Sequence, residues 1–200
     1  MRTSRQLVLF LKAPRVGAVK TRLARGLGRV PAWLFYRRQT ISLIRRLQDP
    51  RWDMKLFISP DSFTRQGNFW PSGARCFPQG EGNLGQRMQR AFDILPSGPV
   101  VIIGGDIPGI DKRDIRRAFN ALETHDMAFG PAEDGGYWLV GMRRRPRVLR
   151  PFDGVRWSTE HALKDTLANI SPSCRVARLR TLADIDEMAD FEMAGFPRPL

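Results

Sequence analysis

Asp106 follows two glycines at the end of an aliphatic run, a position from which a carboxylate can do chemistry. The run Val100–Ile103 is typical of a strand buried on both faces of a parallel sheet. Such a strand delivers the residues after it to the carboxyl edge, where open α/β folds bind their ligands. A carboxylate at this edge could hold a hard cation on a phosphate. The alternative is that Asp106 only caps the next helix, with Pro108 behind it, and the pattern alone leaves both open.

A basic loop comes directly after the first predicted strand, Leu7–Leu11. It carries Lys12, Lys20 and Arg22, and it lies where nucleotide-binding folds hold phosphates. The loop is not a Walker A motif, because Val19 stands where that motif needs glycine before the lysine. An ordinary basic surface loop is the alternative.

A second candidate phosphate contact precedes a predicted helix. Gly82 and Asn83 stand before its first residue, and Arg87 lies in its first turn. Backbone N–H groups at a helix start favour anions, so this turn could hold part of a nucleotide. Asn83 could equally be a simple N-cap, and Arg87 could pair with any acid.

The motif Asp134-Gly135-Gly136-Tyr137 joins two predicted strands. A glycine pair lets a ligand approach the backbone closely, which would suit an acceptor site. Asp-Gly is also a strong signal for a type I′ hairpin turn, and both descriptions can hold together.

Asp184 and Asp186 are alternate residues of a predicted extended segment and would face the same way. They could complete a metal site with Asp106, although helix capping explains them as well. His125 and His161 pair with no evident nucleophile, and no Ser-His-Asp or Cys-His arrangement is apparent.

The order of elements predicts an α/β fold with a mostly parallel sheet. The pattern reads β-α-β-β-α-β-α-β-β-α-β-α, without repeats or a dividing linker, so a single domain over residues 1–200 is expected. Asp111 is expected to cap a helix reaching about Glu123, and Ser158 a helix through about Asn169. The remaining strands and helices are expected at 31–47, 54–58, 74–77, 84–95, 127–129, 136–142 and 175–179.

Composition places the chain among globular proteins, with 42% hydrophobic and 26% charged residues. No apolar run approaches the ~20 residues of a membrane span, and no signal peptide is evident, so a cytoplasmic location is expected. Cys76 and Cys174 lack metal-ligand spacing and are expected as free thiols. The net charge of +13 could attract nucleic acid, but the arginines are interpreted as scattered, and nucleic-acid binding is not expected.

Several short motifs in a fixed order resemble a bacterial family of glycosyltransferase-A-type proteins, often described as nucleotide-diphospho-sugar transferase-like. At greater distance the chain is similar to phospholactate guanylyltransferases. The resemblance covers about residues 7–191 and rests on Lys12-x-Pro14, Gly17-x-x-Lys20-Thr21-Arg22-Leu23, Gln79-x-x-Gly82-x-Leu84-Gly85-x-Arg87-Met88, Gly104-Gly105-Asp106-x-Pro108, Gly130-Pro131-x-x-Asp134-Gly135-Gly136-Tyr137, Trp157-Ser158-Thr159 and Asp184-Ile185-Asp186-x-x-x-Asp190.

This resemblance implies a three-layer α/β/α sandwich that binds a nucleotide. It assigns nucleotide binding to Lys12, Lys20, Arg22, Gly82, Asn83 and Arg87, metal binding to Asp106 and Asp186, and acceptor binding to Asp134, Gly135, Gly136, Tyr137, Trp157 and Ser158. The chain departs from the family pattern at Asn83 and Gln86, where acidic residues are favoured, and at Ile107, where a small polar residue is usual.

The leading hypothesis is a transferase dependent on Mg²⁺ or Mn²⁺, with Asp106, Lys20 and Asp134 as its catalytic residues. Nucleotidyl transfer from an NTP to a phosphorylated or acidic small molecule is favoured, because an anionic acceptor needs no general base. Glycosyl transfer from a nucleotide sugar is the alternative, with Asp134 as the base. A non-catalytic protein that binds phosphate or nucleic acid is the alternative of another class.

Overall fold

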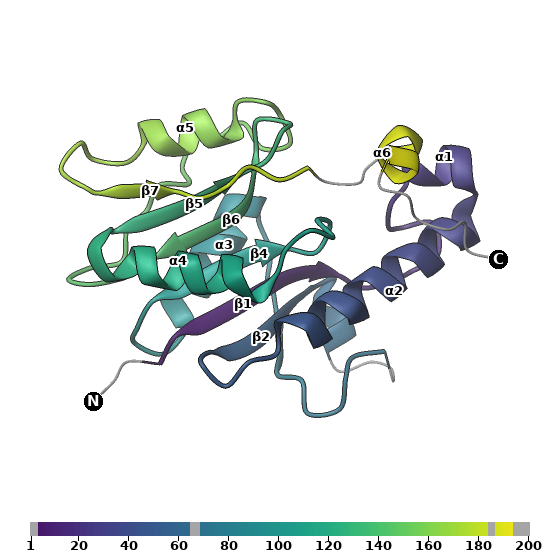
Figure 1. The fold of residues 1–200 in the computed structure, drawn as a ribbon, viewed down its shortest axis with the longest axis horizontal. Helices are drawn as coiled ribbons and strands as arrows, with labels where there is room; N and C mark the ends of the chain where they lie inside the picture. Colours follow the sequence, from purple (N-terminus) through teal and green to yellow (C-terminus); the bar gives the residue numbers. More distant parts are fainter. Residues whose placement is uncertain (1–3, 65–68, 184–186, 194–200) are drawn as a thin grey trace.

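The computed structural model describes residues 4–64, 69–183 and 187–193, and is built around a seven-stranded sheet (Figure 1). The strands lie in the order β3-β2-β1-β4-β6-β5-β7. The strands are β1 (Gln6–Lys12), β2 (Asp53–Ser59), β3 (Cys76–Pro78), β4 (Val100–Gly104), β5 (Met127–Pro131), β6 (Tyr137–Met142) and β7 (Val176–Arg178). The helices are α1 (Leu23–Leu27), α2 (Arg29–Leu47), α3 (Leu84–Ile94), α4 (Lys112–Thr124), α5 (Ala162–Ala168) and α6 (Met188–Met193), with a short 3-10 turn at Asp61–Thr64.

The sheet is mostly parallel, as predicted. Strands β1, β2, β3 and β4 run the same way, and β6 is antiparallel to both of its neighbours, β4 and β5. The order of elements along the chain also matches the prediction, apart from the short helix α1. Its first residue, Leu23, is fully buried against residues of α2 and α6, which form a small lobe with α1. This packing stabilises a helix that is too short to be stable alone.

Alternate residues of β1 build the two halves of the core, which establishes the predicted three layers. Leu9 and Leu11 pack in a cluster with residues of α2 and α4, whereas Val8 packs in a second cluster with residues of α3. Figure 1 shows α2 and α4 on one face of the sheet and α3 on the other. Because both faces are covered, the central strands are continuous apolar runs.

Asp111, and not Asp106, caps the helix that follows β4. Its carboxylate accepts hydrogen bonds from the N–H groups of Arg113 (2.7 Å) and Asp114 (3.1 Å). In turn, the Asp114 carboxylate accepts a hydrogen bond from the Asp111 N–H (2.9 Å). The alternative that Asp106 serves as this cap is therefore wrong. Asn83 caps α3 in the same reciprocal manner with Gln86.

Two local predictions are wrong. Ser158 does not cap a helix, because its φ of 61° is left-handed whereas an N-cap is extended; α5 begins later, after His161. The turn between β5 and β6 is not type I′ either. The Gly135 N–H donates to the Ala132 carbonyl, and only Gly135 has a positive φ in this turn, whereas type I′ needs it at both central residues.

None of the helices in the described ranges is long and apolar enough to cross a membrane.

Candidate functional site

The sheet topology brings the predicted loops to one edge. In the register of the sheet, Lys12 at the end of β1 pairs with Ser59, and Gly104 at the end of β4 pairs with Phe10. Antiparallel β6 begins at this same edge, with Leu139 opposite Ile103. The basic loop, the segment at Asp106 and the diglycine turn therefore all leave the sheet on the side where α/β folds bind ligands.

Lys20 and Asp106 form an ion pair at this edge, with 3.0 Å between Nζ and Oδ1. The Lys20 side chain is 5% exposed, whereas the Asp106 side chain is 48% exposed. Lys20 also has a left-handed backbone, φ 48°, which a non-glycine residue adopts only when its surroundings hold it there. The pair places a covered positive charge behind a carboxylate that faces solvent.

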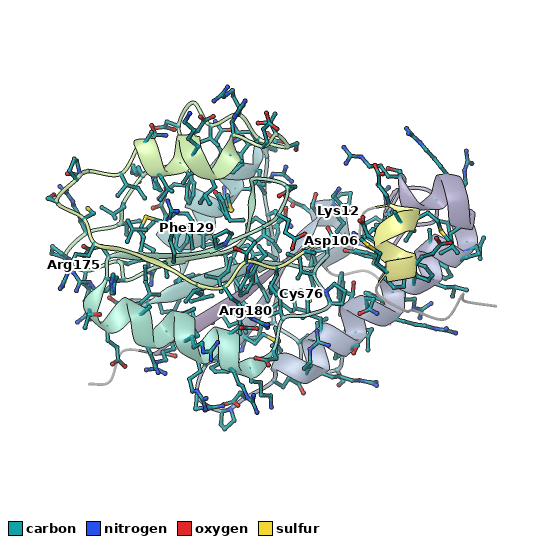
Figure 2. The ribbon with its side chains drawn as sticks, turned by 45° about the horizontal axis from the view of Figure 1, so that its top comes forward. Lys12, Cys76, Asp106, Phe129, Arg175 and Arg180 are labelled. Carbon is teal, nitrogen blue, oxygen red and sulfur yellow. The ribbon has the colours of Figure 1, made fainter. Side chains whose placement is uncertain are left out.

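Tyr36 of α2 binds the end of β1 and senses the charge of Asp106. Its buried hydroxyl donates to the Lys12 carbonyl (2.9 Å) and accepts from the Lys12 N–H (3.0 Å). Burial raises the pKa of Tyr36 well above its ordinary value, and the negative charge of Asp106 raises it further. Figure 2 shows Lys12 and Asp106 in the same region, between the sheet and the lobe of α1 and α6.

Gln79 fixes the position of Arg87 relative to the same strand. The buried Gln79 amide donates to the carbonyls of Leu11 (3.2 Å) and Phe57 (2.9 Å), while its oxygen accepts from Arg87 Nη1 (3.2 Å). Arg90 donates to the Gln79 carbonyl (2.8 Å) and lies over Gly80, where a side chain would overlap it. Gln79 thus joins the turn before α3 to the end of β1 and holds the Arg87 guanidinium beside it.

The predicted acceptor residues form a second group around the turn at Gly135. There φ is +82°, and an added Cβ would overlap the carbonyl oxygen of Glu160, so only glycine lets the loop before α5 lie against this turn. The ring of Trp157 packs against Tyr137, with 6.3 Å between centroids. It also packs against the first turn of α3, where a Cβ on Gly85 would meet the indole at 2.6 Å.

The structure therefore brings two of the predicted groups together directly and leaves one apart. Lys20 and Asp106 form an ion pair in the region where Lys12 ends β1, and Gln79 joins the turn of Arg87 to the same strand. Asp134 uses Oδ1 to accept from the Gly136 N–H (2.9 Å), and within the described residues no hydrogen bond or ion pair joins it to Asp106. Arg22 and Ser158 are exposed, at the start of α1 and in the loop before α5.

No group of three His, Cys, Asp or Glu side chains capable of holding a metal occurs in the described part of the chain. Asp186, the second expected metal ligand, lies outside the described residues. Of the two expected metal ligands, the structure therefore describes one, the half-exposed carboxylate of Asp106. This fits Mg²⁺, which is often held by one or two carboxylates together with substrate phosphates, better than it fits a metal held by protein ligands alone.

Tyr36 and Gln79 are the residues that the sequence interpretation did not single out. Tyr36 follows the helical spacing of core residues in α2, so its hydroxyl gave no separate signal. Gln79 opens the Gln-x-x-Gly motif, and its presence in that motif was the only available hint of its role.

Comparison with protein families decides the relationship of the chain. A family model described as "Uncharacterized protein conserved in bacteria (DUF2064)" matches residues 42–159, more than half of the sequence. The chain belongs to this family. The matched segment of this DUF2064 protein includes Tyr36's helix only in part, but it contains Asp106, Arg87 and the diglycine turn. No match is found among curated proteins.

Solved structures confirm the predicted resemblance and fold of this DUF2064 protein. A "putative nucleotide-diphospho-sugar transferase" from Desulfovibrio desulfuricans G20 superposes with a TM-score of 0.86 at 28% identity, over 96% of this chain and 86% of that chain. The 4-diphosphocytidyl-2C-methyl-D-erythritol synthase of Anaerococcus prevotii DSM 20548 gives 0.61 at 11% identity, over 96% of each chain.

A third neighbour was crystallised with its ligands. The glucosyl-3-phosphoglycerate synthase of Mycobacterium tuberculosis, in complex with Mn²⁺, uridine diphosphate and glucosyl-3-phosphoglycerate, gives a TM-score of 0.54 at 12% identity. The alignment covers 96% of this chain and 76% of that chain. By their names these neighbours are transferases and synthases, in agreement with the prediction that the chain is a transferase; the two neighbours at low identity show the fold alone.

Proposed function

We propose that this protein transfers the nucleotidyl group of a nucleoside triphosphate to a phosphorylated or otherwise acidic small molecule. The observation that carries this proposal is the ion pair between Lys20 and Asp106 at the carboxyl edge of the sheet. A covered ammonium beside a half-exposed carboxylate offers a phosphate group one positive partner and offers a cation one negative partner.

The roles follow from where the side chains lie. Lys12, Lys20 and Arg22 would bind the donor phosphates, and the turn of Gly82 and Asn83 with Arg87 would bind another part of the nucleotide. The acceptor would lie near Gly135, Gly136 and Tyr137, with Trp157 and Ser158 from the loop packed against that turn. Asp134 would contact the acceptor from the same turn. Gln79 hydrogen-bonds both to β1 and to Arg87, which supports a nucleotide site shared between the basic loop after β1 and the turn before α3.

The chemistry would be an in-line displacement. An oxygen of the acceptor attacks the α-phosphorus of the triphosphate, the bond from that phosphorus to the bridging oxygen of the β-phosphate breaks, and pyrophosphate leaves. Lys20 and Arg22 would stabilise the charge on the departing pyrophosphate. An acceptor phosphate is already anionic, so the residues need not remove a proton from it.

Asp106 would hold Mg²⁺ or Mn²⁺, with Asp186 as a second ligand. The bound ion would neutralise charge on the donor phosphates. Lys20 already neutralises Asp106 in the structure described here, so a cation alone would compete with an ammonium group 3.0 Å away. When a nucleotide is present, the half-exposed Asp106 can exchange its contact with Lys20 for the ion, while a phosphate oxygen of the nucleotide becomes the partner of Lys20. We therefore expect metal and nucleotide to bind together.

Glycosyl transfer from a nucleotide sugar is the second candidate, favoured by the printed description of the neighbour at 28% identity. It would need a base for the acceptor hydroxyl, and Asp134 is the residue for that role. Asp134 Oδ1 already accepts a hydrogen bond from the Gly136 N–H (2.9 Å), so one oxygen of this candidate base is engaged within the turn, which favours nucleotidyl transfer.

A product screen distinguishes the candidates. The wild-type protein is incubated with each of the four nucleoside triphosphates, or with common nucleotide sugars, together with phosphorylated acceptors and Mg²⁺ or Mn²⁺. Release of pyrophosphate that depends on the acceptor supports the proposal, and release of nucleoside diphosphate from a nucleotide sugar supports the second candidate. Asp106→Asn should reduce either product on the order of 100-fold. Asp153→Asn, at an exposed aspartate in the loop before α5, is the matched control. Absence of both products would contradict both candidates.

A further inference from the structure

The positive charge of this protein is concentrated in its first quarter, so the interpretation of scattered arginines is wrong in this respect. Residues 1–48 contain twelve of the 33 Lys and Arg residues and no Asp or Glu, whereas the rest of the chain is nearly balanced, with 21 basic and 20 acidic residues. Almost the whole net charge of +13 therefore belongs to β1, the basic loop, α1 and α2.

Ion pairing differs between the two parts, although Arg5 pairs with Glu123 and Lys20 with Asp106. Beyond residue 48, many arginines pair with carboxylates: Arg51 with Asp49, Arg75 with Asp53, Arg150 with Asp93, Arg156 with Asp165, and Arg180 with Asp114. Within the described residues, no carboxylate pairs with Arg25 or Arg29, nor with three arginines of α2, namely Arg37, Arg38 and Arg45. Long nitrogen-tipped side chains project outward from α1 and α2 (Figure 2). The outward face of α2 therefore carries three arginines, Arg37, Arg38 and Arg45, that pair with no carboxylate among the described residues.

The outward face of α2 also has an apolar stripe. At 100° per residue, Val30, Leu34 and Ile41 fall within a narrow sector opposite the buried residues, with Arg37 on one side and Arg38 on the other. Val30 is 53% exposed. Leu34 and Ile41 line a hollow of about 740 Å³ together with arginines of the same helix.

A second hollow lies at the basic loop and the start of α2. It has a volume of about 760 Å³ and is lined by Arg15, Arg25 and Arg29 together with Val16, which is 53% exposed. Each hollow thus combines aliphatic side chains with arginines that have no carboxylate partner among the described residues, and the one on α2 lies along the apolar stripe.

We propose that the outward face of α2, defined by Val30, Leu34, Arg37, Arg38, Ile41 and Arg45, binds the surface of a membrane rich in anionic phospholipid. The apolar stripe would enter the boundary between headgroups and acyl chains, and the arginines beside it would contact lipid phosphates while covering it with their alkyl stems. Nucleic acid would use the arginines, but it offers no partner for exposed Val30 and the half-buried Leu34 and Ile41 beside it. A second copy of the chain would set arginines against arginines across the contact.

The proposal is independent of the transferase reaction. Tyr36 and the other buried residues of α2 face the sheet, so the outward face can dock without displacing the residues of the candidate site. Its failure would leave the proposed function intact, and the reverse also holds.

Vesicle flotation tests the membrane contact with the full-length protein. The protein should float with vesicles of phosphatidylcholine and phosphatidylglycerol, but not with phosphatidylcholine alone, and binding should weaken as salt is raised. Because each arginine near an anionic surface contributes about a fivefold change in partitioning, replacing two of them with Glu in Arg38→Glu/Arg45→Glu should lower binding on the order of 100-fold. Both side chains are exposed, so the fold should be retained.

A matched control changes the same net charge elsewhere. Arg116→Glu/Arg117→Glu reverses two exposed arginines on α4 and should leave flotation within a few-fold of wild type. Leu34→Ser/Ile41→Ser should reduce flotation but leave binding to an oligonucleotide unchanged. The proposal is overturned by no flotation with anionic vesicles, by equal losses in both arginine variants, by oligonucleotide binding at physiological salt in the absence of vesicle binding, or by self-association through α2 seen in sedimentation.

Discussion

Lys20 Nζ lies 3.0 Å from Asp106 Oδ1, although the two residues come from different loops, after β1 and β4. The relationship is asymmetric, because the lysine is almost covered and the carboxylate is half exposed. A covered charge depends on its neighbours for solvation, whereas an exposed one has water. The carboxylate is therefore the member of the pair that can exchange partners when a ligand arrives.

This asymmetry predicts unequal effects on stability. Asp106→Asn should lower the free energy of unfolding by about 1 kcal/mol, because the covered ammonium loses a counter-charge. Lys20→Met should have a smaller effect, because a half-exposed carboxylate left behind is solvated by water. Urea unfolding of the two variants measures which loses more free energy of unfolding. A larger loss for Lys20→Met would show that the pair is not organised in this way.

Catalysis should respond differently from stability. Both variants should reduce transfer on the order of 100-fold, because each removes a charge that acts on the donor phosphates. The measurement is kcat/KM of the folded variants for the donor found in the product screen. Activity close to wild type in Asp106→Asn would exclude this carboxylate from the reaction.

Gln79 should act as a positioning residue. Gln79→Ala removes the amide that holds Leu11 and Phe57 and leaves Arg87 without its partner oxygen, so KM for the nucleotide should rise more than kcat falls. The unmade hydrogen bonds should also cost about 2 kcal/mol of stability. Gln39→Ala, at a partly buried glutamine of α2, is the control. A loss of stability without any change in KM would reduce Gln79 to a structural role.

Gly135 can be tested against a glycine with a similar backbone. Gly154 also has a positive φ, +66°, but an added Cβ there would meet nothing within 4 Å, whereas at Gly135 it would overlap the Glu160 backbone. Gly154→Ala should therefore cost only the left-handed strain, about 1 kcal/mol, and Gly135→Ala about 3 kcal/mol or more. Equal thermal stability of the two variants would contradict the close packing of the loop before α5 on this turn.

The two tyrosines give a prediction for alkaline pH. Burial raises the pKa of both Tyr36 and Tyr137, the only tyrosines in the chain, so neither should ionise near pH 10 in the folded protein. The unfolded state loses these protons first, so stability is fully present below pH about 10 and falls above it by about 1.4 kcal/mol per pH unit for each tyrosine.

Tyrosinate absorbance measures this directly. Tyr36→Phe and Tyr137→Phe should each remove one of the two high-pH transitions, and each should flatten the alkaline loss of stability. Ionisation of a tyrosine at its ordinary pKa in the native protein would show that its ring is not buried as described.

The architecture could be predicted from the sequence because the central strands are continuous apolar runs. The run Val100–Ile103 and the spacing of apolar residues in α2 and α3 reflect burial that the sheet requires, and each was located within a few residues. The capping residue Asn83 was also predictable, because capping is a local interaction. The failures share the opposite property: Ser158 and the turn at Gly135 are set by contact between two loops that are distant in the chain.

The candidate site was predictable in its residues but not in its connections. Family motifs pointed to Lys20, Asp106 and Arg87, but nothing in the sequence indicates that Tyr36 binds the end of β1 or that Gln79 joins Arg87 to that strand. Those links depend on main-chain carbonyls, which every residue has and which leave no mark in a sequence. The distribution of charge was visible in the sequence, but its meaning depended on which arginines have carboxylate partners.

Isothermal titration with nucleotide and metal, separately and together, tests the central claim most directly. The account predicts that Mg²⁺ or Mn²⁺ alone gives no binding heat, that one class of nucleoside triphosphate binds in the presence of the metal, and that Asp106→Asn loses the metal-dependent part of that affinity while retaining its fold. Failure of every nucleoside triphosphate and nucleotide sugar to bind wild-type protein at millimolar concentration would contradict it.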